Sequence, residues 1–284
     1  MSSKRVSSVK LDKLIKILKG FGRVLIAYSG GVDSTFLLKV AEGVLKENVL
    51  AVTARSATYT QEELDFARGF AREHKIRHIV IQSRELEDKR FSRNPANRCY
   101  YCKKELFAKL KRIARREKID YVADAANCDD SKDFRPGAIA AKEFCVRSPL
   151  KEAGFTKHDI RNYSKKLGLG TWNAPTQACL ASRFPYGYKI NVRDLKKVAC
   201  AEKILKQAGF RQLRVRHYNG LCRIEVPKND LRRLIGLRPL IVDKFKRLGY
   251  NYVTVDLEGY RSGSMNEEIK VTPHARAGNI RYRR

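Results

Sequence analysis

The sequence predicts an α/β protein with a doubly wound parallel sheet, followed by a smaller C-terminal α+β domain. Short apolar runs alternate with helical apolar patterns over the first half of the chain, which is typical of a parallel sheet covered by helices on both faces. After residues 168–187, a stretch interrupted by Gly and Pro, the order of the elements changes. We therefore expect one domain over residues 1–188 and a second over residues 189–284.

The elements of the first domain alternate along the chain. Strands are expected at 24–28, 49–53, 78–81 and 121–123, and helices at 35–45, 62–73 and 103–117. The second domain is expected to contain a helix over 192–208, strands at 213–217 and 221–226, helices within 229–248 and a last strand at 252–256. In a doubly wound sheet, ligands bind at the carboxyl ends of the strands.

Composition limits the class of protein. The chain has 284 residues, 43% of them hydrophobic, which is enough to bury a sizeable core. Its 60 Lys and Arg against 30 Asp and Glu give a formal net charge of +30, which favours anionic partners without choosing among nucleotides, phosphorylated substrates and nucleic acid.

The cellular location of the protein is predicted from its apolar runs and its cysteines. No uninterrupted apolar stretch approaches the ~18 residues of a membrane span, and the first residues do not form an apolar signal segment. Seven irregularly spaced cysteines argue against a secreted disulfide framework. We expect a cytoplasmic protein with no membrane association.

The segment that follows the first strand has the features of a phosphate loop. Two glycines allow a sharp turn and a close approach to an anion, while the N–H groups and dipole of the next helix face the same point. The spacing is neither that of a Walker A loop nor G-x-G-x-x-G, and the alternative is an ordinary strand-to-helix turn. The predicted nucleotide-binding residues are Ser29, Gly30, Gly31, Val32, Asp33 and Ser34.

Two carboxylates belong to this prediction. Asp33 is a candidate ligand, direct or through water, of a magnesium ion on the nucleotide; the alternative is that it caps the helix that follows. Asp124 ends the strand at 121–123 and is expected to line the same site.

Three cysteines form the second candidate site. Cys99 and Cys102 form a C-x-x-C pair before a helical pattern, and Cys179 lies in the loop before the second domain. The pair alone is compatible with a redox couple, half a zinc site or coincidence. Three thiolates suit a 4Fe-4S cluster with one open iron, whereas structural zinc prefers four ligands. We expect the other four to pack in apolar surroundings: Cys128, Cys145, Cys200 and Cys222.

Arginines form the third candidate site. Arg214 and Arg216 alternate along one expected strand and so point to one face, where a guanidinium pair suits a mononucleotide phosphate. Arg261 is expected to join them, and the alternative is a solvated basic strand. Arg183, four residues after Cys179, is a candidate for stabilising phosphate charge; the alternative is a structural ion pair.

Taken together, these motifs resemble the LarE family, whose catalytic domain is a PP-loop ATP pyrophosphatase of the adenine nucleotide alpha hydrolase type. The resemblance rests on 29–34, 133–137, 178–187, 214–219, 223–225 and 256–266, and so covers nearly the whole chain. It implies that ATP adenylates a carboxylate of pyridinium biscarboxylic acid mononucleotide. Sulfur then enters to give the thiocarboxylate of the nickel-pincer cofactor.

The resemblance also bears on the sulfur source and on assembly. Cys179 matches the family's sulfur-donating cysteine, and cysteines at 99 and 102 imply the branch in which three cysteines hold a 4Fe-4S cluster that carries sulfide. In the other branch the single cysteine gives up its own sulfur, so Cys179 is either cluster ligand or donor. The family further implies a homo-oligomer, described as a hexamer, with contacts near Glu202, His217 and Glu225.

Two other function classes stay open on sequence grounds. A tRNA-thiolating enzyme would combine a pyrophosphate loop, C-x-x-C and a cluster, and would suit the positive charge, although no RRM or KH signature is present. A non-catalytic nucleotide- or RNA-binding protein would keep the loop without the chemistry.

Overall fold

The computed structural model describes residues 2–132, 136–175, 178–270 and 281–282. The chain forms two compact units. The first consists of Met1–Glu85 and Cys99–Gln177, and the second of Leu86–Arg98 and Ala178–Arg284. Residues 178–188, which the sequence analysis assigned to the first domain, thus fold with the second unit, as does the short segment Leu86–Arg98. As functional domains, the spans 1–188 and 189–284 remain a prediction.

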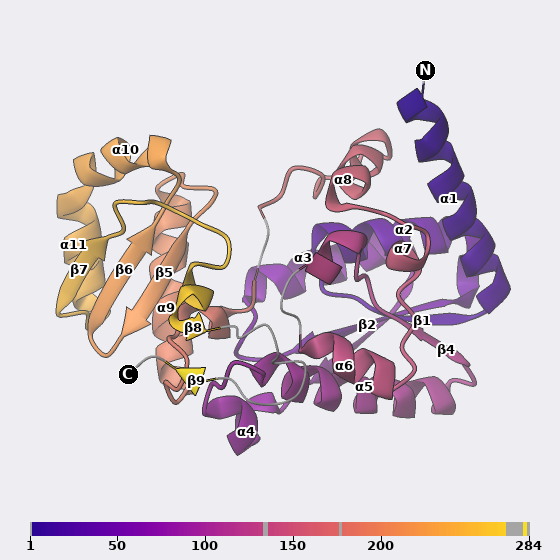
Figure 1. The fold of residues 1–284 in the computed structure, drawn as a ribbon, viewed down its shortest axis with the longest axis horizontal. Helices are drawn as coiled ribbons and strands as arrows, with labels where there is room; N and C mark the ends of the chain where they lie inside the picture. Colours follow the sequence, from indigo (N-terminus) through magenta and orange to yellow (C-terminus); the bar gives the residue numbers. More distant parts are fainter. Residues whose placement is uncertain (1, 133–135, 176–177, 271–280, 283–284) are drawn as a thin grey trace. The chain divides into compact units, whose positions relative to one another are not determined.

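The first unit contains the predicted parallel sheet (Figure 1). Its strands are β1 (Val24–Ala27), β2 (Val49–Arg55), β3 (Arg77–Gln82) and β4 (Tyr121–Ala123), in the order β3-β2-β1-β4. All neighbouring pairs are parallel. The predicted α/β fold is therefore confirmed, with strand ends within two residues of those expected.

Helices cover both faces of this sheet. Side chains alternate along β1, so Val24 and Ile26 join one core while Leu25 joins the other. The first core is closed by α1 (Ser2–Phe21), α2 (Val32–Leu45), α3 (Gln61–Glu73), α7 (Pro149–Glu152) and α8 (Lys157–Lys166). The second is closed by α5 (Arg98–Arg116) and α6 (Gly137–Glu143).

The strand order creates a natural ligand crevice. The chain runs outward from β1 through β2 to β3 and then returns to the opposite side of β1 to form β4. The carboxyl ends of β1 and β4 are thus the topological switch point, where doubly wound sheets bind ligands. The loop 29–34 begins there.

The second unit is built on a mixed sheet with the order β5-β6-β7. β5 (Arg214–Tyr218) and β6 (Leu221–Glu225) form an antiparallel hairpin, while β7 (Tyr252–Val255) is parallel to β6. The hairpin turn consists of Asn219 and Gly220, both with positive φ, as a two-residue turn of this kind requires. Its core lies between the sheet and the helices α9 (Val192–Gln207), α10 (Leu231–Gly236) and α11 (Arg238–Arg247).

The helices expected within 229–248 are two, α10 and α11. A 3₁₀ turn, η5 (Lys228–Asp230), precedes α10, and α11 begins with Pro239 in its first turn. Proline has no N–H to continue a preceding helix, so the chain starts a new one. The remaining short elements of this unit are α4 (Lys89–Ser92), η4 (Leu180–Arg183), η6 (Ser264–Glu268), β8 (Ile269–Lys270) and β9 (Arg281–Tyr282). Three further 3₁₀ turns are η1 (Lys46–Asn48), η2 (Glu85–Glu87) and η3 (Cys128–Lys132).

Within the parts of the chain that the structure describes, no helix has both the length and the apolar character needed to cross a membrane.

Candidate functional site

The phosphate loop, residues 29–34, consists of the turn after β1 and the first residues of α2, which begins at Val32. The hydroxyl oxygens of Ser29 and Ser34 lie 3.0 Å apart, and the Ser34 hydroxyl donates to the carbonyl of Gly31 at 3.2 Å. Gly31 is the N-cap residue and provides no side chain to bond the first-turn N–H groups of α2. The helix therefore presents an N-terminus suited to an anion.

Position 30 requires glycine both for its backbone conformation and for its close packing. Its φ is +74°, and an added Cβ would lie 3.3 Å from both the Glu63 carbonyl oxygen and the Phe66 ring. Gly31 has an ordinary φ of −75°, and an added Cβ would meet only the Ser29 hydroxyl, at 3.4 Å. The close packing of the loop against α3 thus depends on the first of the two glycines.

Asp33 lies in the first turn of α2 but does not cap it. Its carboxylate accepts a hydrogen bond from the ammonium of Lys157, with Nζ and Oδ2 2.5 Å apart. Lys157 is the first residue of α8, and both side chains are partly exposed. Lys157 is a residue that sequence analysis missed, because the pair spans 124 positions along the chain.

Asp124 directly follows β4, whose Ala123 pairs with Ile26 of β1. The parallel register therefore brings Asp124 to the same edge of the sheet as the phosphate loop, as expected. Its Oδ1 accepts hydrogen bonds from the Ser148 hydroxyl at 2.7 Å and from the backbone N–H of Ala126 at 3.1 Å. These bonds fix the carboxylate at the switch point.

In the second unit, Arg183 is an almost fully buried ion-pair partner, at 4% exposure. Its Nε and Nη2 donate to the two carboxylate oxygens of Glu202 at 2.8 and 2.9 Å. Its Nη1 donates to the carbonyl oxygens of Ala178 and Cys179 at 2.6 and 3.2 Å. Burial alone would raise the pKa of Glu202, but the Arg183 guanidinium outweighs it and holds that pKa below its usual value. Arg183 thereby ties the Cys179 backbone to α9.

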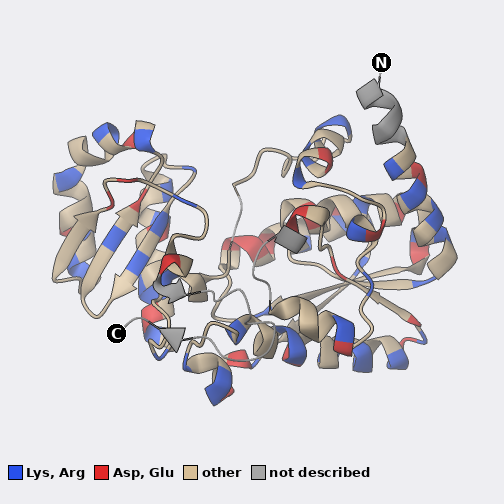
Figure 2. Ribbon diagram, viewed as in Figure 1, with Lys and Arg blue, Asp and Glu red and all other residues tan. Residues whose placement is uncertain are grey.

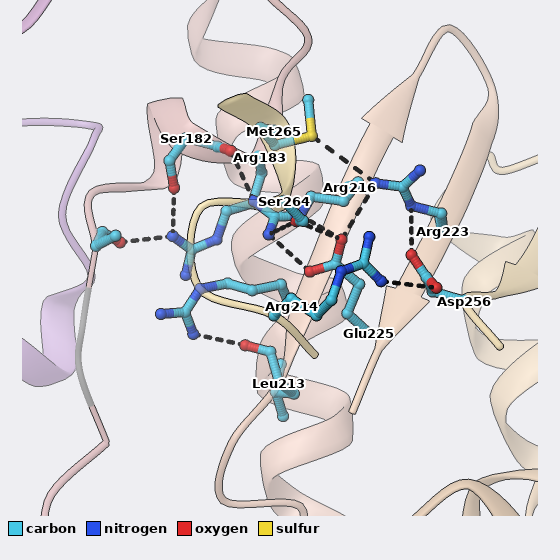
Figure 3. A network of polar contacts seen from close by, with 12 residues as sticks. Ser182, Arg183, Leu213, Arg214, Arg216, Arg223, Glu225, Asp256, Ser264 and Met265 are labelled. Carbon is cyan, nitrogen blue, oxygen red and sulfur yellow. Dashed lines mark hydrogen bonds and ion pairs between the residues drawn. The ribbon is translucent and has the colours of Figure 1, made fainter. Parts of the chain in front are cut away.

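Arg216 forms the second buried pair (Figure 3). Its Nε and Nη2 donate to the Glu225 carboxylate at 2.9 and 2.6 Å, across the β5–β6 hairpin. Further bonds run to the Ser182 carbonyl at 2.8 Å and the Ser264 hydroxyl at 2.9 Å. Arg223, opposite Arg216 in the hairpin register, donates to Glu225 at 3.2 Å. This refutes the alternative of a solvated basic strand for Arg216.

Arg214 completes this set of guanidinium groups. It is 7% exposed, donates to the Leu213 carbonyl at 2.6 Å and lies over the Tyr260 ring at 5.3 Å. Burial, together with the neighbouring positive charge of Arg183, lowers the pKa of Arg214 to about 10. We call Arg183, Arg214, Arg216 and Arg223 the arginine cluster (Figure 3). Positive charge is concentrated here at a cost that a bound anion would relieve.

Arg261 differs from the cluster in exposure. Its side chain is 32% exposed and pairs with Glu258 at 2.7 Å and Glu267 at 3.1 Å, both mainly exposed carboxylates. Asp256 links it to the cluster, since it lies 3.8 Å from Arg261 and 3.4 Å from Arg223. Arg223, Ser264 and Asp256 are members of this network that sequence analysis did not assign.

The cysteines are all thiols. Cys99 and Cys102 lie three residues apart in the first turn of α5, which places them on one side of the helix. Cys179 is the N-cap of η4 in the second unit. In the described parts of the chain, no three His, Cys, Asp or Glu side chains stand together as metal ligands.

Two of the four cysteines assigned to packing do not fit that role. Cys222 is buried and Cys128 is half-buried, but Cys145 and Cys200 are exposed. On α9 the buried face contains Leu195, Val198 and Leu205, and Cys200 lies outside that helical period. The prediction for Cys145 and Cys200 was therefore wrong.

Other predicted features are described by the structure only in part. Residues 133–135, which belong to one of the motifs named above, are outside the described residues. His217 and Glu225 are buried inside the second unit at 2% and 0% exposure, and their place near a subunit contact stays a prediction. Lys and Arg occur on helices of both units (Figure 2), so the net charge is not confined to one helix.

The glycine loop at the switch point of a parallel sheet defines this chain as a PP-loop ATP pyrophosphatase by class. The Asparagine synthase family model, which represents this class of domain, matches residues 16–96 and includes the loop. Relatives extend over nearly the whole chain. An uncharacterized protein of Synechocystis sp. is 44% identical over 262 residues, covering 92% of this chain and 98% of its own. An uncharacterized protein of Methanocaldococcus jannaschii is 32% identical over 89% of this chain and 99% of its own.

A relative with a described activity is the pyridinium-3,5-bisthiocarboxylic acid mononucleotide synthase of Lactiplantibacillus plantarum. It is 37% identical over 263 residues, covering 92% of this chain and 95% of the synthase. The chain belongs to the LarE family, the family of this synthase.

Proposed function

We propose that this protein is an ATP-dependent sulfur transferase. It adenylates a carboxylate of pyridinium-3,5-biscarboxylic acid mononucleotide and replaces the activated oxygen by sulfur, giving a thiocarboxylate for the nickel-pincer cofactor. The observation that carries the proposal is the uncapped glycine loop at the switch point, in a chain similar over nearly its full length to a pyridinium-3,5-bisthiocarboxylic acid mononucleotide synthase.

In the first step, the phosphate loop binds the pyrophosphate portion of ATP. Backbone N–H groups at the start of α2 and the hydroxyls of Ser29 and Ser34 would donate to its oxygens. A substrate carboxylate oxygen attacks the α-phosphorus, the bond to the bridging oxygen breaks, and pyrophosphate leaves. The product is an acyl adenylate with AMP as a good leaving group. Asp33 and Asp124 offer carboxylate oxygens of the type that Mg²⁺ prefers, at the edge where the phosphates would lie.

The arginine cluster is proposed to hold the substrate's phosphate. Arg183, Arg214 and Arg216 are three buried cations, and the buried carboxylates among them are Glu202 and Glu225. Carboxylates that hold Arg183 and Arg216 in bidentate geometry preorganise the guanidinium groups before the phosphate arrives. The lowered pKa of Arg214 supports the same role, because a phosphate dianion would favour the charged guanidinium. Arg261 would contribute from the exposed rim.

In the second step, a sulfur nucleophile attacks the activated acyl carbon and expels AMP. Cys179 is the proposed sulfur-handling residue, and the bond from Arg183 to its carbonyl oxygen orients the loop that presents its thiol. Arg183 is thus a positioning residue for Cys179 as well as a member of the arginine cluster.

The sulfur source is proposed to involve a 4Fe-4S cluster held by Cys99, Cys102 and Cys179. Soft thiolates suit such a cluster, and Cys99 and Cys102 share one side of the first turn of α5. When bound by three thiolates, a cluster supplies one iron that no protein sulfur occupies and that can bind sulfide. An external sulfide or sulfur donor would then be the co-substrate, and the family resemblance implies assembly as a homo-oligomer.

The function is tested by the substrate dependence of pyrophosphate release. Release should require both ATP and the pyridinium mononucleotide and should ignore added tRNA. Arg216→Lys should weaken the binding of the mononucleotide, so that a higher mononucleotide concentration is needed for release, because it removes a bidentate guanidinium. Release stimulated by tRNA alone, with a thiolated nucleoside in the product, would replace the proposal by a tRNA-thiolating activity.

The sulfur source is tested separately by mass spectrometry after turnover. With a cluster, anaerobically prepared protein should contain iron and sulfide, make several products per chain and keep Cys179 intact. Cys99→Ala and Cys102→Ala should each lose the iron, while Cys200→Ala, an exposed cysteine on α9, should keep it. One product per chain, no iron and loss of H₂S from Cys179 would establish Cys179 as the donor.

A further inference from the structure

The second unit contains a cavity of about 290 Å³ that is separate from the arginine cluster. Side chains alternate along β5, so Arg214 and Arg216 point to one face of the sheet and His217 points to the other. The lining side chains with polar groups are Tyr188, Arg193, Asp194, Lys197, His217 and Asn219.

Two cations line the cavity from one helix. Arg193 and Lys197 are four residues apart on α9 and therefore lie on the same side of it. Arg193 is exposed and makes no hydrogen bond or ion pair with any residue that the structure describes. Lys197 donates to the Gly249 carbonyl at 2.6 Å and lies 4.0 Å from the centre of the Tyr250 ring. Burial lowers the pKa of Lys197, so an anion near its ammonium would be stabilising.

The single carboxylate of the cavity is already hydrogen-bonded. Asp194 accepts from the Tyr188 hydroxyl and from the Asn191 amide, each at 2.6 Å. Both bonds end on the same oxygen, Oδ2, and the cavity therefore combines one carboxylate with two cations, Arg193 and Lys197, so its lining is net positive.

Uncharged polar groups form the inner wall. The buried His217 ring has Nε2 3.2 Å from the Tyr188 hydroxyl and Nδ1 3.3 Å from the Tyr250 hydroxyl. The turn residues Asn219 and Gly220 close one side with backbone of positive φ. A small acceptor entering here would meet the side-chain amide of Asn219 in addition to the two cations.

We propose that this cavity binds a small oxyanion, a phosphate or carboxylate group, between Arg193 and Lys197. The site is distinct from the phosphate loop and from the arginine cluster, and it does not depend on the proposed function. Its volume admits a compact anion together with a small organic group.

The test uses the full chain and inorganic phosphate at constant ionic strength, followed through the NMR signal of His217. That signal is assigned by its loss in His217→Gln; if this variant does not fold, its displacement in Tyr188→Phe serves instead. Phosphate should shift the signal to a saturating value, and Arg193→Gln should weaken the apparent affinity about tenfold by removing a charge-assisted hydrogen bond. Sodium acetate in a parallel titration distinguishes a carboxylate preference from a phosphate preference.

The matched control is Lys196→Gln, which removes one charge from an exposed position of the same helix outside the cavity. Its affinity should equal that of the unmodified chain. Equal weakening in Arg193→Gln and Lys196→Gln, or a His217 signal that does not respond, would overturn the proposal and assign any binding to the general positive charge. Mononucleotide-dependent pyrophosphate release should be unchanged in Arg193→Gln, so this outcome is independent of the proposed function.

Discussion

The phosphate loop and the arginine cluster are both suited to anions, but they are built in opposite ways. The loop offers backbone N–H groups and two serine hydroxyls, with the Asp33–Lys157 ion pair beside it. The cluster uses buried guanidinium groups whose geometry is fixed by the carboxylates of Glu202 and Glu225. The difference teaches that a site made of backbone depends on conformation, whereas a site made of buried side chains depends on charge balance.

The largest effect is expected on the stability of the second unit, in a variant that disturbs its buried charge balance. Glu225→Gln leaves the buried Arg216 without its bidentate carboxylate and should destabilise this unit by about 3–5 kcal/mol. Hydrogen exchange followed by mass spectrometry should show faster exchange in β5 and β6 and no change in β1. The control is Glu267→Gln, which removes a 63% exposed partner of Arg261 and should cost at most about 1 kcal/mol. Equal protection in the two variants would show that Glu225 does not stabilise the cluster.

The second prediction tests conformation in the first unit. Gly30→Val places a branched side chain at φ +74° and against the Glu63 carbonyl, so the loop must move. A displacement on the order of 1 Å should lower the rate of pyrophosphate release about a hundredfold. Gly31→Ala, at a position with an ordinary φ, should lower the rate of pyrophosphate release far less. Hydrogen exchange in β1 checks that the sheet persists, and similar rates for both variants would contradict the distinction between the two glycines.

The same contrast explains what the sequence could predict. The loop was located correctly because its glycines, serines and flanking strand and helix are contiguous, and local sequence determines backbone conformation. The position of Asp124 at the end of β4 also followed from the sequence, since the carboxyl ends of parallel strands share one edge; its role in a nucleotide site stays a prediction. The fold followed from the same alternation of strand and helix.

Pairings between distant side chains were not predictable in this way. Arg183 bonds Glu202 across 19 positions, and Lys157 bonds Asp33 across 124, which no spacing rule relates. One pairing was accessible: the Asn219–Gly220 turn fixes the hairpin register and so sets Arg223 opposite Arg216. The helices expected within 229–248 were confirmed as α10 and α11, and Pro239, a local signal in the sequence, lies in the first turn of the second.

The smallest expected effect concerns the ion pair at the loop itself. If Asp33 binds Mg²⁺, the ammonium of Lys157 competes with the metal for the same carboxylate oxygen. Lys157→Met should then lower the Mg²⁺ concentration needed for half-maximal pyrophosphate release by a few-fold, since a partly exposed pair contributes about 1 kcal/mol or less.

The chain offers a matched control for this last measurement. Lys10→Met breaks an ion pair of similar exposure, to Asp159 in the first turn of the same helix α8, without contacting Asp33. Its Mg²⁺ requirement should be unchanged. A higher requirement in Lys157→Met would mean that the ion pair holds the loop in its binding conformation instead of competing with the metal. The same shift in both variants would reduce the effect to a loss of positive charge near the nucleotide. Asp33 is supported as a metal ligand only if the Mg²⁺ requirement falls in Lys157→Met and not in Lys10→Met. The phosphate loop, otherwise built from backbone and hydroxyl groups, would then depend on the charge of one side chain.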